Sequence, residues 1–189
     1  MIEKPKSYCE FVSSLDPFNL HKLYHDTEYG FNIDDDNQLF ERLVLEINQA
    51  GLSWATILNK QKNFQKAFDN FEIQKVASYA EMDKERLLND AGIIRNRLKI
   101  NAAIHNALVI VELQKEFGSF KKWIDHHHPK TKDEWVKIFK KTFKFTGGEI
   151  VNEFLMSTGY LEGAHIETCL TYKRIEKMKP RWLVNHSPF

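Results

Sequence analysis

The sequence predicts an all-α fold, because apolar residues recur at three- and four-residue spacing along nearly its whole length. The best candidate for a strand is the β-branched run Val109–Val111, but it lies inside a longer helical pattern. A length of 189 residues suits one domain, or two small lobes that share a core. No internal repeat or Pro/Gly-rich linker marks a boundary, so we expect one domain over residues 1–189.

The clearest helix begins at Asp34–Asp36, whose carboxylates are typical N-caps, and ends near Gly51. Its apolar residues lie on one face and are Leu39, Phe40, Leu43, Val44 and Ile47. Five further helices are expected, at Thr56–Phe68, Asp83–Asp90, Arg95–Phe117, Lys132–Phe143 and Glu149–Ser157.

Charge and composition restrict the class of protein. A net charge of +1 excludes a strongly basic protein but not a local basic patch. The polar start MIEKPKSYCE does not resemble a signal peptide, and no apolar run approaches the ~20 residues that cross a bilayer. We therefore expect a cytoplasmic protein that does not enter the membrane, in a compartment where disulfides are rare.

The two cysteines each have a histidine nearby, as Cys9 with His25 and His165 with Cys169. On a helix, the H-x-x-x-C spacing of the second pair would put both side chains on one face. Two thiolates and two imidazoles form a standard tetrahedral zinc site, which here would join the first and last parts of the chain. A Cys9–Cys169 disulfide and two ordinary buried thiols are the alternatives, because such distant half-sites match no local zinc-finger spacing.

A tight turn with glycine follows the Asp83–Asp90 helix. Gly92 and Ile93 lie in the turn, and Arg95 and Arg97 open the next helix. Such a turn can present main-chain N–H groups to a phosphate. It resembles a helix-hairpin-helix, which many DNA-repair proteins use to hold the sugar-phosphate backbone, although Ile94 stands where a second glycine is usual. The alternative is an ordinary helical corner with solvated basic residues.

Glu46 flanks the apolar stripe of the first predicted helix, and Trp54 follows a Gly-Leu-Ser turn after it. The pair is either the solvated edge of an amphipathic helix, or a buried acceptor beside a ring that can stack on a ligand. Tyr24 and Tyr29 supply further rings next to His25. The residue pattern alone leaves both interpretations open.

Taken together, these motifs resemble the DNA-3-methyladenine glycosylase I family of bacterial base-excision repair. The similarity covers about Cys9 to Cys169 and leaves residues 170–189 as a basic C-terminal tail. The motifs that carry it are Tyr24-His25-Asp26, Leu45-Glu46, Gln49-Ala50-Gly51-Leu52-Ser53-Trp54, Asp90-Ala91-Gly92-Ile93-Ile94-Arg95 and Phe143-Lys144-Phe145.

The resemblance implies a helix-hairpin-helix glycosylase with a structural Zn²⁺ that ties its terminal regions. Such an enzyme flips 3-methyladenine out of double-stranded DNA and hydrolyses the glycosidic bond, without lyase activity and as a monomer. It implies that Tyr24, Tyr29 and Trp54 surround the base and that Glu46 accepts its hydrogen bonds, with a catalytic role for Glu46 still open. The expected DNA contacts are Gly92, Ile93, Arg95 and Arg97, and the expected zinc ligands are Cys9, His25, His165 and Cys169.

Two departures from the family pattern affect the expected pocket. Tyr29 stands where tryptophan is common, and Thr146–Glu153 replaces a Gly-Pro/Thr-Thr type of segment. These departures put the exact base preference in doubt. Two rival functions from other classes also stay open at this point. One is a protein that binds alkylation damage without cleaving it, and the other is a zinc-stapled interaction domain without a pocket.

Overall fold

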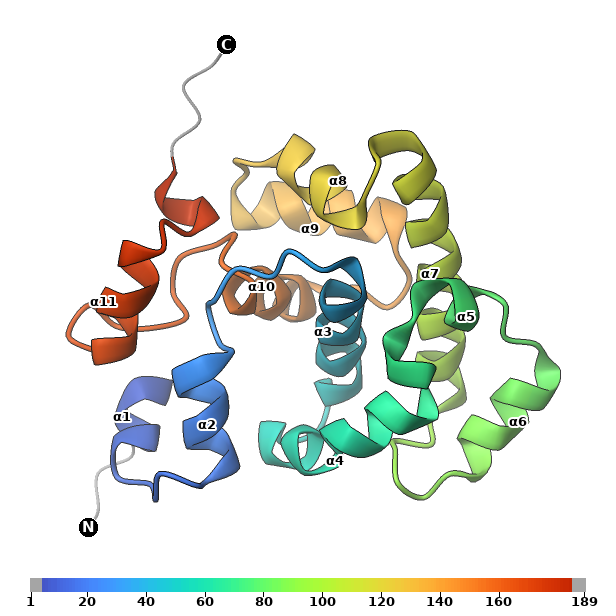
Figure 1. Ribbon diagram of the computed structural model, residues 1–189, viewed down its shortest axis with the longest axis horizontal. Helices are drawn as coiled ribbons and strands as arrows, with labels where there is room; N and C mark the ends of the chain where they lie inside the picture. Colours follow the sequence, from blue (N-terminus) through green and yellow to red (C-terminus); the bar gives the residue numbers. More distant parts are fainter. Residues whose placement is uncertain (1–4, 185–189) are drawn as a thin grey trace. The chain divides into compact units, whose positions relative to one another are not determined.

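The computed structural model describes residues 5–184, and within them every regular element is a helix (Figure 1). The all-α prediction is therefore confirmed. Contacts divide the chain into two compact units, which we call the terminal unit (Met1–Asn32 and Leu155–Phe189) and the central unit (Ile33–Phe154). The single domain expected from the sequence stays a prediction. No helix within the described part of the chain is long and apolar enough to span a membrane.

The terminal unit contains short helices that the sequence pattern did not predict. They are α1 (Tyr8–Ser13), α2 (Leu20–Thr27), α11 (Leu170–Lys177) and the 3₁₀ helix η2 (Arg181–Leu183). Side chains start the first two, because Ser7 accepts a hydrogen bond from the Glu10 N–H and Asn19 from the His21 N–H. The segment expected as a basic tail includes α11, which buries Thr171 and Ile175.

The central unit contains the helices that were expected. Its elements are α3 (Asp36–Gln49), α4 (Trp54–Ala67), η1 (Asp69–Phe71), α5 (Ile73–Ala77), α6 (Glu81–Asn89), α7 (Arg97–Phe117), α8 (Phe120–His127), α9 (Lys132–Thr142) and the first part of α10 (Gly148–Ser157). The six predicted helices are α3, α4, α6, α7, α9 and α10, with ends displaced by a few residues. Helix α7 packs against α5 and α8, and α3 packs against α4.

Helix α3 contributes buried side chains to the core of the central unit, and Glu46 lies in its second half. Its predicted apolar stripe is completely buried, at Leu39, Phe40, Leu43, Val44 and Ile47. Asp35 caps the helix by accepting from the Gln38 N–H, while the Asp36 carboxylate accepts from the first two N–H groups of α8, at Phe120 and Lys121. After Ala50 the chain leaves the helix through Gly51, whose φ of +82° suits glycine.

An aromatic cluster packs α8, α9 and α10 together in the same unit. Neighbouring ring centroids lie 5.4–6.4 Å apart, mostly in edge-to-face or tilted pairs. Its members are Phe120, Trp123, Phe139, Phe143 and Phe154. Aromatic residues contribute large buried areas, and their pairing adds about 0.5–1.5 kcal/mol each. The cluster therefore fixes the end of α9 and the loop that follows it.

Candidate active site and metal centre

Four potential metal ligands meet inside the terminal unit. Cys9 lies on α1, His25 on α2, His165 in the loop after α10, and Cys169 at the residue that precedes α11. Their ligand atoms all lie within 4.8 Å of one another. The sequence therefore identified correctly which four side chains come together.

The H-x-x-x-C pair does not lie on a helix, so helical spacing is not what brings its two side chains together. Residues 158–169 form turns and bends, and Cys169 is the residue just before the first turn of α11 instead of lying within the helix. Gly159, with φ of +77°, and Gly163, with φ of +122°, take the chain out of helical geometry between the two helices. A bend in the chain, with a hydrogen bond from the Cys169 N–H to the Ile166 carbonyl, brings the pair together.

The distances within the cluster fit a tetrahedral zinc ion. His165 Nδ1 lies 3.1 Å from His25 Nε2 and 3.6 Å from Cys9 Sγ. Cys169 Sγ lies 3.7 Å from His25 Nε2 and 4.0 Å from His165 Nδ1. Zn–N bonds of about 2.0–2.1 Å and Zn–S bonds of about 2.3 Å require roughly 3.4 Å between nitrogens and 3.6 Å between nitrogen and sulfur. Small shifts of the side chains would therefore complete the coordination.

The outward nitrogens of both imidazoles also have suitable partners. His25 Nδ1 lies 2.7 Å from an Asp26 carboxylate oxygen, and His165 Nε2 lies 2.7 Å from the Tyr29 carbonyl oxygen. Metal-binding histidines commonly donate their second N–H to such acceptors, which fixes the ring and the tautomer. Burial lowers the pKa of His165 to about 4, so its ring is neutral at neutral pH, as a ligand must be.

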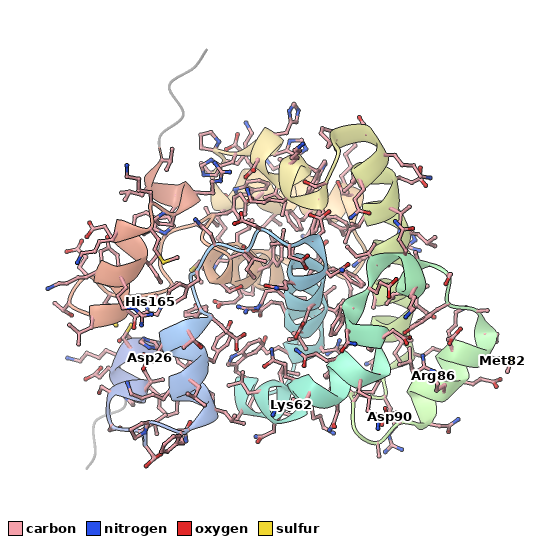
Figure 2. The ribbon with its side chains drawn as sticks, in the orientation of Figure 1. Asp26, Lys62, Met82, Arg86, Asp90 and His165 are labelled. Atoms are coloured by element: carbon pink, nitrogen blue, oxygen red, sulfur yellow. The ribbon has the colours of Figure 1, made fainter. Side chains whose placement is uncertain are left out.

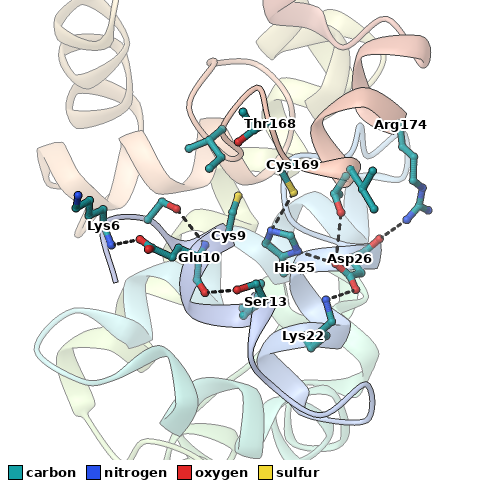
Figure 3. Close-up of a pocket in the computed structure, with 15 residues that line it drawn as sticks. Lys6, Cys9, Glu10, Ser13, Lys22, His25, Asp26, Thr168, Cys169 and Arg174 are labelled. Atoms are coloured by element: carbon teal, nitrogen blue, oxygen red, sulfur yellow. Dashed lines mark hydrogen bonds and ion pairs between the residues drawn. The ribbon is translucent and has the colours of Figure 1, made fainter. Parts of the chain in front are cut away.

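The sulfur atoms are free, and the cluster is reached through a cavity. Neither Cys9 nor Cys169 is in a disulfide, which removes the disulfide alternative. A cavity of about 850 Å³ lies beside the cluster, and both cysteines and His25 contribute to its wall (Figure 3). Lys22 lies 3.2 Å from the Asp26 carboxylate at this wall, and Arg174 donates to the Asp26 carbonyl.

Glu46 is a buried carboxylate in the central unit. Its side chain is on the core face of α3, and only 4 % of the residue is exposed. Burial raises its pKa to about 8, with Glu153 acting in the same direction and Arg42, one turn earlier on α3, acting against it. The interpretation of Glu46 as a solvated helix edge is therefore wrong. Sequence reasoning missed Arg42, although its spacing of four residues from Glu46 was visible.

The aromatic candidates lie in both units. Tyr24 and Tyr29 are buried in the terminal unit, with ring centroids 5.5 Å apart and planes tilted by 34°. Trp54 is the first residue of α4 in the central unit and is half-buried. Ser53 caps that helix by accepting from the Thr56 N–H, which explains why the Gly-Leu-Ser turn ends directly at the tryptophan.

The predicted turn between α6 and α7 is present, and its polar groups are partly used internally. The Asp90 side chain, at the end of α6 in Figure 2, accepts from the Gly92 N–H at 2.7 Å. The Lys60 ammonium donates to the carbonyls of Ala91 and Gly92, at 2.9 and 3.1 Å. Ile93 is buried and anchors the turn in the core.

The second half of the turn faces solvent. Arg95 and Arg97 are exposed, and Asn96 between them caps α7 by accepting from the N–H groups of Leu98 and Lys99. Arg97 lies 3.8 Å from Glu81, a pair in which both side chains are mostly exposed. Within residues 5–184 the N–H groups of Ile94 and Arg95 donate no hydrogen bond.

The chain is similar to characterised proteins over most of its length. The sequence model of a family described as methyladenine glycosylase matches residues 15–172. DNA-3-methyladenine glycosylase 1 of Escherichia coli K12 is 37% identical over 183 residues, which cover 87% of this chain and 96% of the relative.

Two solved structures have the same fold as this chain. The 3-methyladenine DNA glycosylase I of Staphylococcus aureus superposes with a TM-score of 0.78 at 30% identity, covering 89% of this chain and 97% of the relative. A tyrosine-to-phenylalanine variant of 3-methyladenine DNA glycosylase I in complex with 3-methyladenine gives a TM-score of 0.77 at 30% identity, covering 87% of this chain and 96% of that one.

Proposed function

Because the chain belongs to the methyladenine glycosylase family, we propose that it removes 3-methyladenine from alkylated double-stranded DNA by hydrolysing the N-glycosidic bond. The observation that carries this proposal is the buried carboxylate of Glu46, a costly feature on an apolar helix face unless a ligand uses it. A base inside a duplex is out of reach, so the enzyme must flip it out, and a damaged base costs less to unstack.

The charge of the substrate explains what Glu46 does. Alkylation at N3 makes the base in DNA cationic, so it leaves readily and its departure needs no general acid. Glu46 has a pKa of about 8 in the ligand-free protein, so its carboxyl group is mostly neutral at pH 7. A cationic base beside it favours the carboxylate, so binding is coupled to release of a proton. Glu46 is therefore first a group that recognises the base. If it also contributes to catalysis, it does so through the negative charge of its carboxylate beside the cationic base.

Aromatic rings complete the proposed recognition. Tyr24, Tyr29 and Trp54 are the candidates, and electron-rich rings attract a cationic base by roughly 0.5–2 kcal/mol per contact. The Tyr29 main-chain carbonyl is also hydrogen-bonded to the imidazole of His165. The position of this proposed zinc ligand and the position of the Tyr29 ring are therefore linked within the terminal unit.

DNA is held, in this proposal, by the turn between α6 and α7. Gly92 and Ile93 shape the turn. Phosphate is contacted by the exposed side chains of Arg95 and Arg97 and by the main-chain N–H groups of Ile94 and Arg95, which donate no hydrogen bond within residues 5–184. Lys60 supports this arrangement because its ammonium group binds the carbonyl oxygens of the turn. These oxygens carry partial negative charge and would otherwise repel a phosphate. The turn is our candidate for the helix-hairpin-helix of the family.

Cys9, His25, His165 and Cys169 are the proposed ligands of one structural Zn²⁺, supported by their mutual distances and by the acceptors behind both imidazoles. The ion would supply a crosslink between the first and last segments of the terminal unit. The four residues would supply all four ligands of the ion, which is typical of structural and not of catalytic zinc.

The natural setting follows from the substrate. We expect the protein to act as a monomer on chromosomal DNA in the bacterial cytoplasm, without a lyase step. The rival functions are a damage-binding protein that does not cleave and a zinc-stapled interaction domain.

Incubation with methylated DNA, followed by chromatography of the released bases, separates these functions. The proposed enzyme releases 3-methyladenine. A damage-binding protein retains methylated DNA but releases no base, and an interaction domain neither retains the DNA nor binds free 3-methyladenine. Either of these last two results would overturn the proposal.

A further inference from the structure

Phe145, in the loop between α9 and α10, combines a strained backbone with an exposed ring. Its φ is +63°, in the left-handed region that aromatic residues rarely adopt, yet 40% of the residue is exposed. Phe71 also has a positive φ, of +56°, but it is completely buried, so core packing accounts for its conformation. The exposed Phe145 has no such explanation. Strain of this kind persists where the surroundings impose it, and it is common at ligand-binding sites.

The residues on both sides of Phe145 are held firmly. The buried Asn106 side chain on α7 accepts from the Lys144 N–H at 2.8 Å and donates to the Lys144 carbonyl at 3.1 Å. On the other side, the Thr146 hydroxyl is buried and lies within hydrogen-bond distance of the Phe139 and Phe143 carbonyls, at 3.1 and 3.2 Å. The loop is therefore rigid on both sides of a ring that itself reaches solvent.

Lys99 places this ring near the proposed DNA-binding turn. Its ammonium group lies 5.9 Å from the centre of the Phe145 ring and is itself buried. It donates to the carbonyls of Asn48 and Ala50 at the end of α3, at 2.9 and 2.7 Å. Lys99 is the third residue of α7, two residues after the exposed Arg97. Phe145 thus lies beside the start of the helix that presents the arginines.

We propose that the ring of Phe145 stacks on a nucleobase of the substrate DNA, next to the nucleotide that is flipped out. Flipping leaves the neighbouring base without a stacking partner, and every base offers a π-face, so such a contact tolerates any sequence. A rigid ring loses little entropy on binding, which fits a loop fixed by Asn106 and Thr146. This inference rests on the proposed DNA glycosylase function and adds a contact to the duplex that is separate from recognition of the excised base.

The test compares Phe145→Gly with Phe145→Trp. The control is Leu108→Ala, which changes another exposed apolar residue, on α7. Glycine accepts the positive φ, so Phe145→Gly relieves the strain and should fold with a melting temperature near that of the wild type. Affinity for a duplex with an abasic-site analogue is measured by fluorescence anisotropy, affinity for free 3-methyladenine by calorimetry, and base release by chromatography.

Phe145→Gly should weaken binding to the duplex by roughly five- to a hundredfold, as expected for the loss of one stacked base. Phe145→Trp and Leu108→Ala should bind the duplex like the wild type, and all variants should bind free 3-methyladenine equally. Unchanged duplex affinity in Phe145→Gly, or an equal loss of affinity for the free base, would overturn the inference. A wild-type protein that binds the duplex but releases no base would instead contradict the proposed function.

Discussion

Replacing Glu46 with glutamine is expected to stabilise the folded protein, by an amount that grows with pH. Burial raises the pKa of Glu46 from its ordinary value of 4.5 to about 8. Between these two values the folded protein keeps a proton that the unfolded chain has lost, so the stability of the wild type falls as the pH rises. Glutamine does not titrate, so the variant lacks this loss.

The size of the effect follows from the two pKa values. One unit corresponds to about 1.4 kcal/mol, so the wild type loses about 3 kcal/mol between pH 4.5 and pH 7 and about 5 kcal/mol by pH 8 or above. Urea unfolding of wild type and Glu46→Gln at pH 5, 6, 7 and 8 measures the difference. It should be small at pH 5 and increase steadily. A difference that is constant with pH would refute a buried, protonated Glu46.

The same substitution is expected to weaken binding. Loss of a charge-assisted hydrogen bond costs roughly 1.5–3 kcal/mol, so affinity for free 3-methyladenine should fall by roughly ten- to a hundredfold. Glu41→Gln, on the same helix, is the matched control, because Glu41 accepts hydrogen bonds from Gln61 and Gln65 and should leave binding unchanged. Equal affinities of Glu46→Gln and wild type in calorimetry would rule out the proposed role.

Three further predictions concern the DNA contacts, Lys99 and the metal centre. Reversing Arg95 and Arg97 to glutamate should weaken DNA binding and reduce its salt dependence, with affinity for free base unchanged; an equal loss of both would show that the surface is misassigned. Lys99→Met leaves a buried and a partly buried carbonyl at the end of α3 without their donor, so it should lower stability by about 1–3 kcal/mol in urea unfolding, and an unchanged midpoint would contradict this. Metal analysis should find one zinc per chain in the wild type and none in Cys9→Ser/Cys169→Ser, which should also melt at a lower temperature; full zinc content in that variant would exclude these ligands.

The long helices could be predicted from the sequence, but the short ones could not. In α3 and α7 the apolar spacing extends over several turns, so the period is evident. Helices α1, α2 and α8 have six to eight residues, which is too short for a period to show, and side-chain caps start them instead. The loop geometry of His165 and Cys169 depends on glycines whose conformation is fixed only in the folded chain.

The residues of the candidate site were easier to predict from the sequence than the groups that hydrogen-bond to them. The proposed metal ligands stand out because the chain has only two cysteines, and Glu46 stands out because it is a carboxylate that flanks an apolar stripe. The Tyr29 carbonyl behind His165 and the α3 carbonyls bound by Lys99 are main-chain groups, so no residue type signals them. Asn106 contacts a loop that follows 38 residues later, which no local pattern indicates.

We propose that this protein breaks only the glycosidic bond of an alkylated adenine and leaves the DNA strand intact. The most direct test counts abasic sites and strand breaks formed in methylated duplex DNA for each 3-methyladenine released. We expect one abasic site per released base and no strand break beyond the background of untreated DNA. Strand cleavage in step with base release, or methylated DNA that keeps its 3-methyladenine in the presence of excess protein, would contradict it.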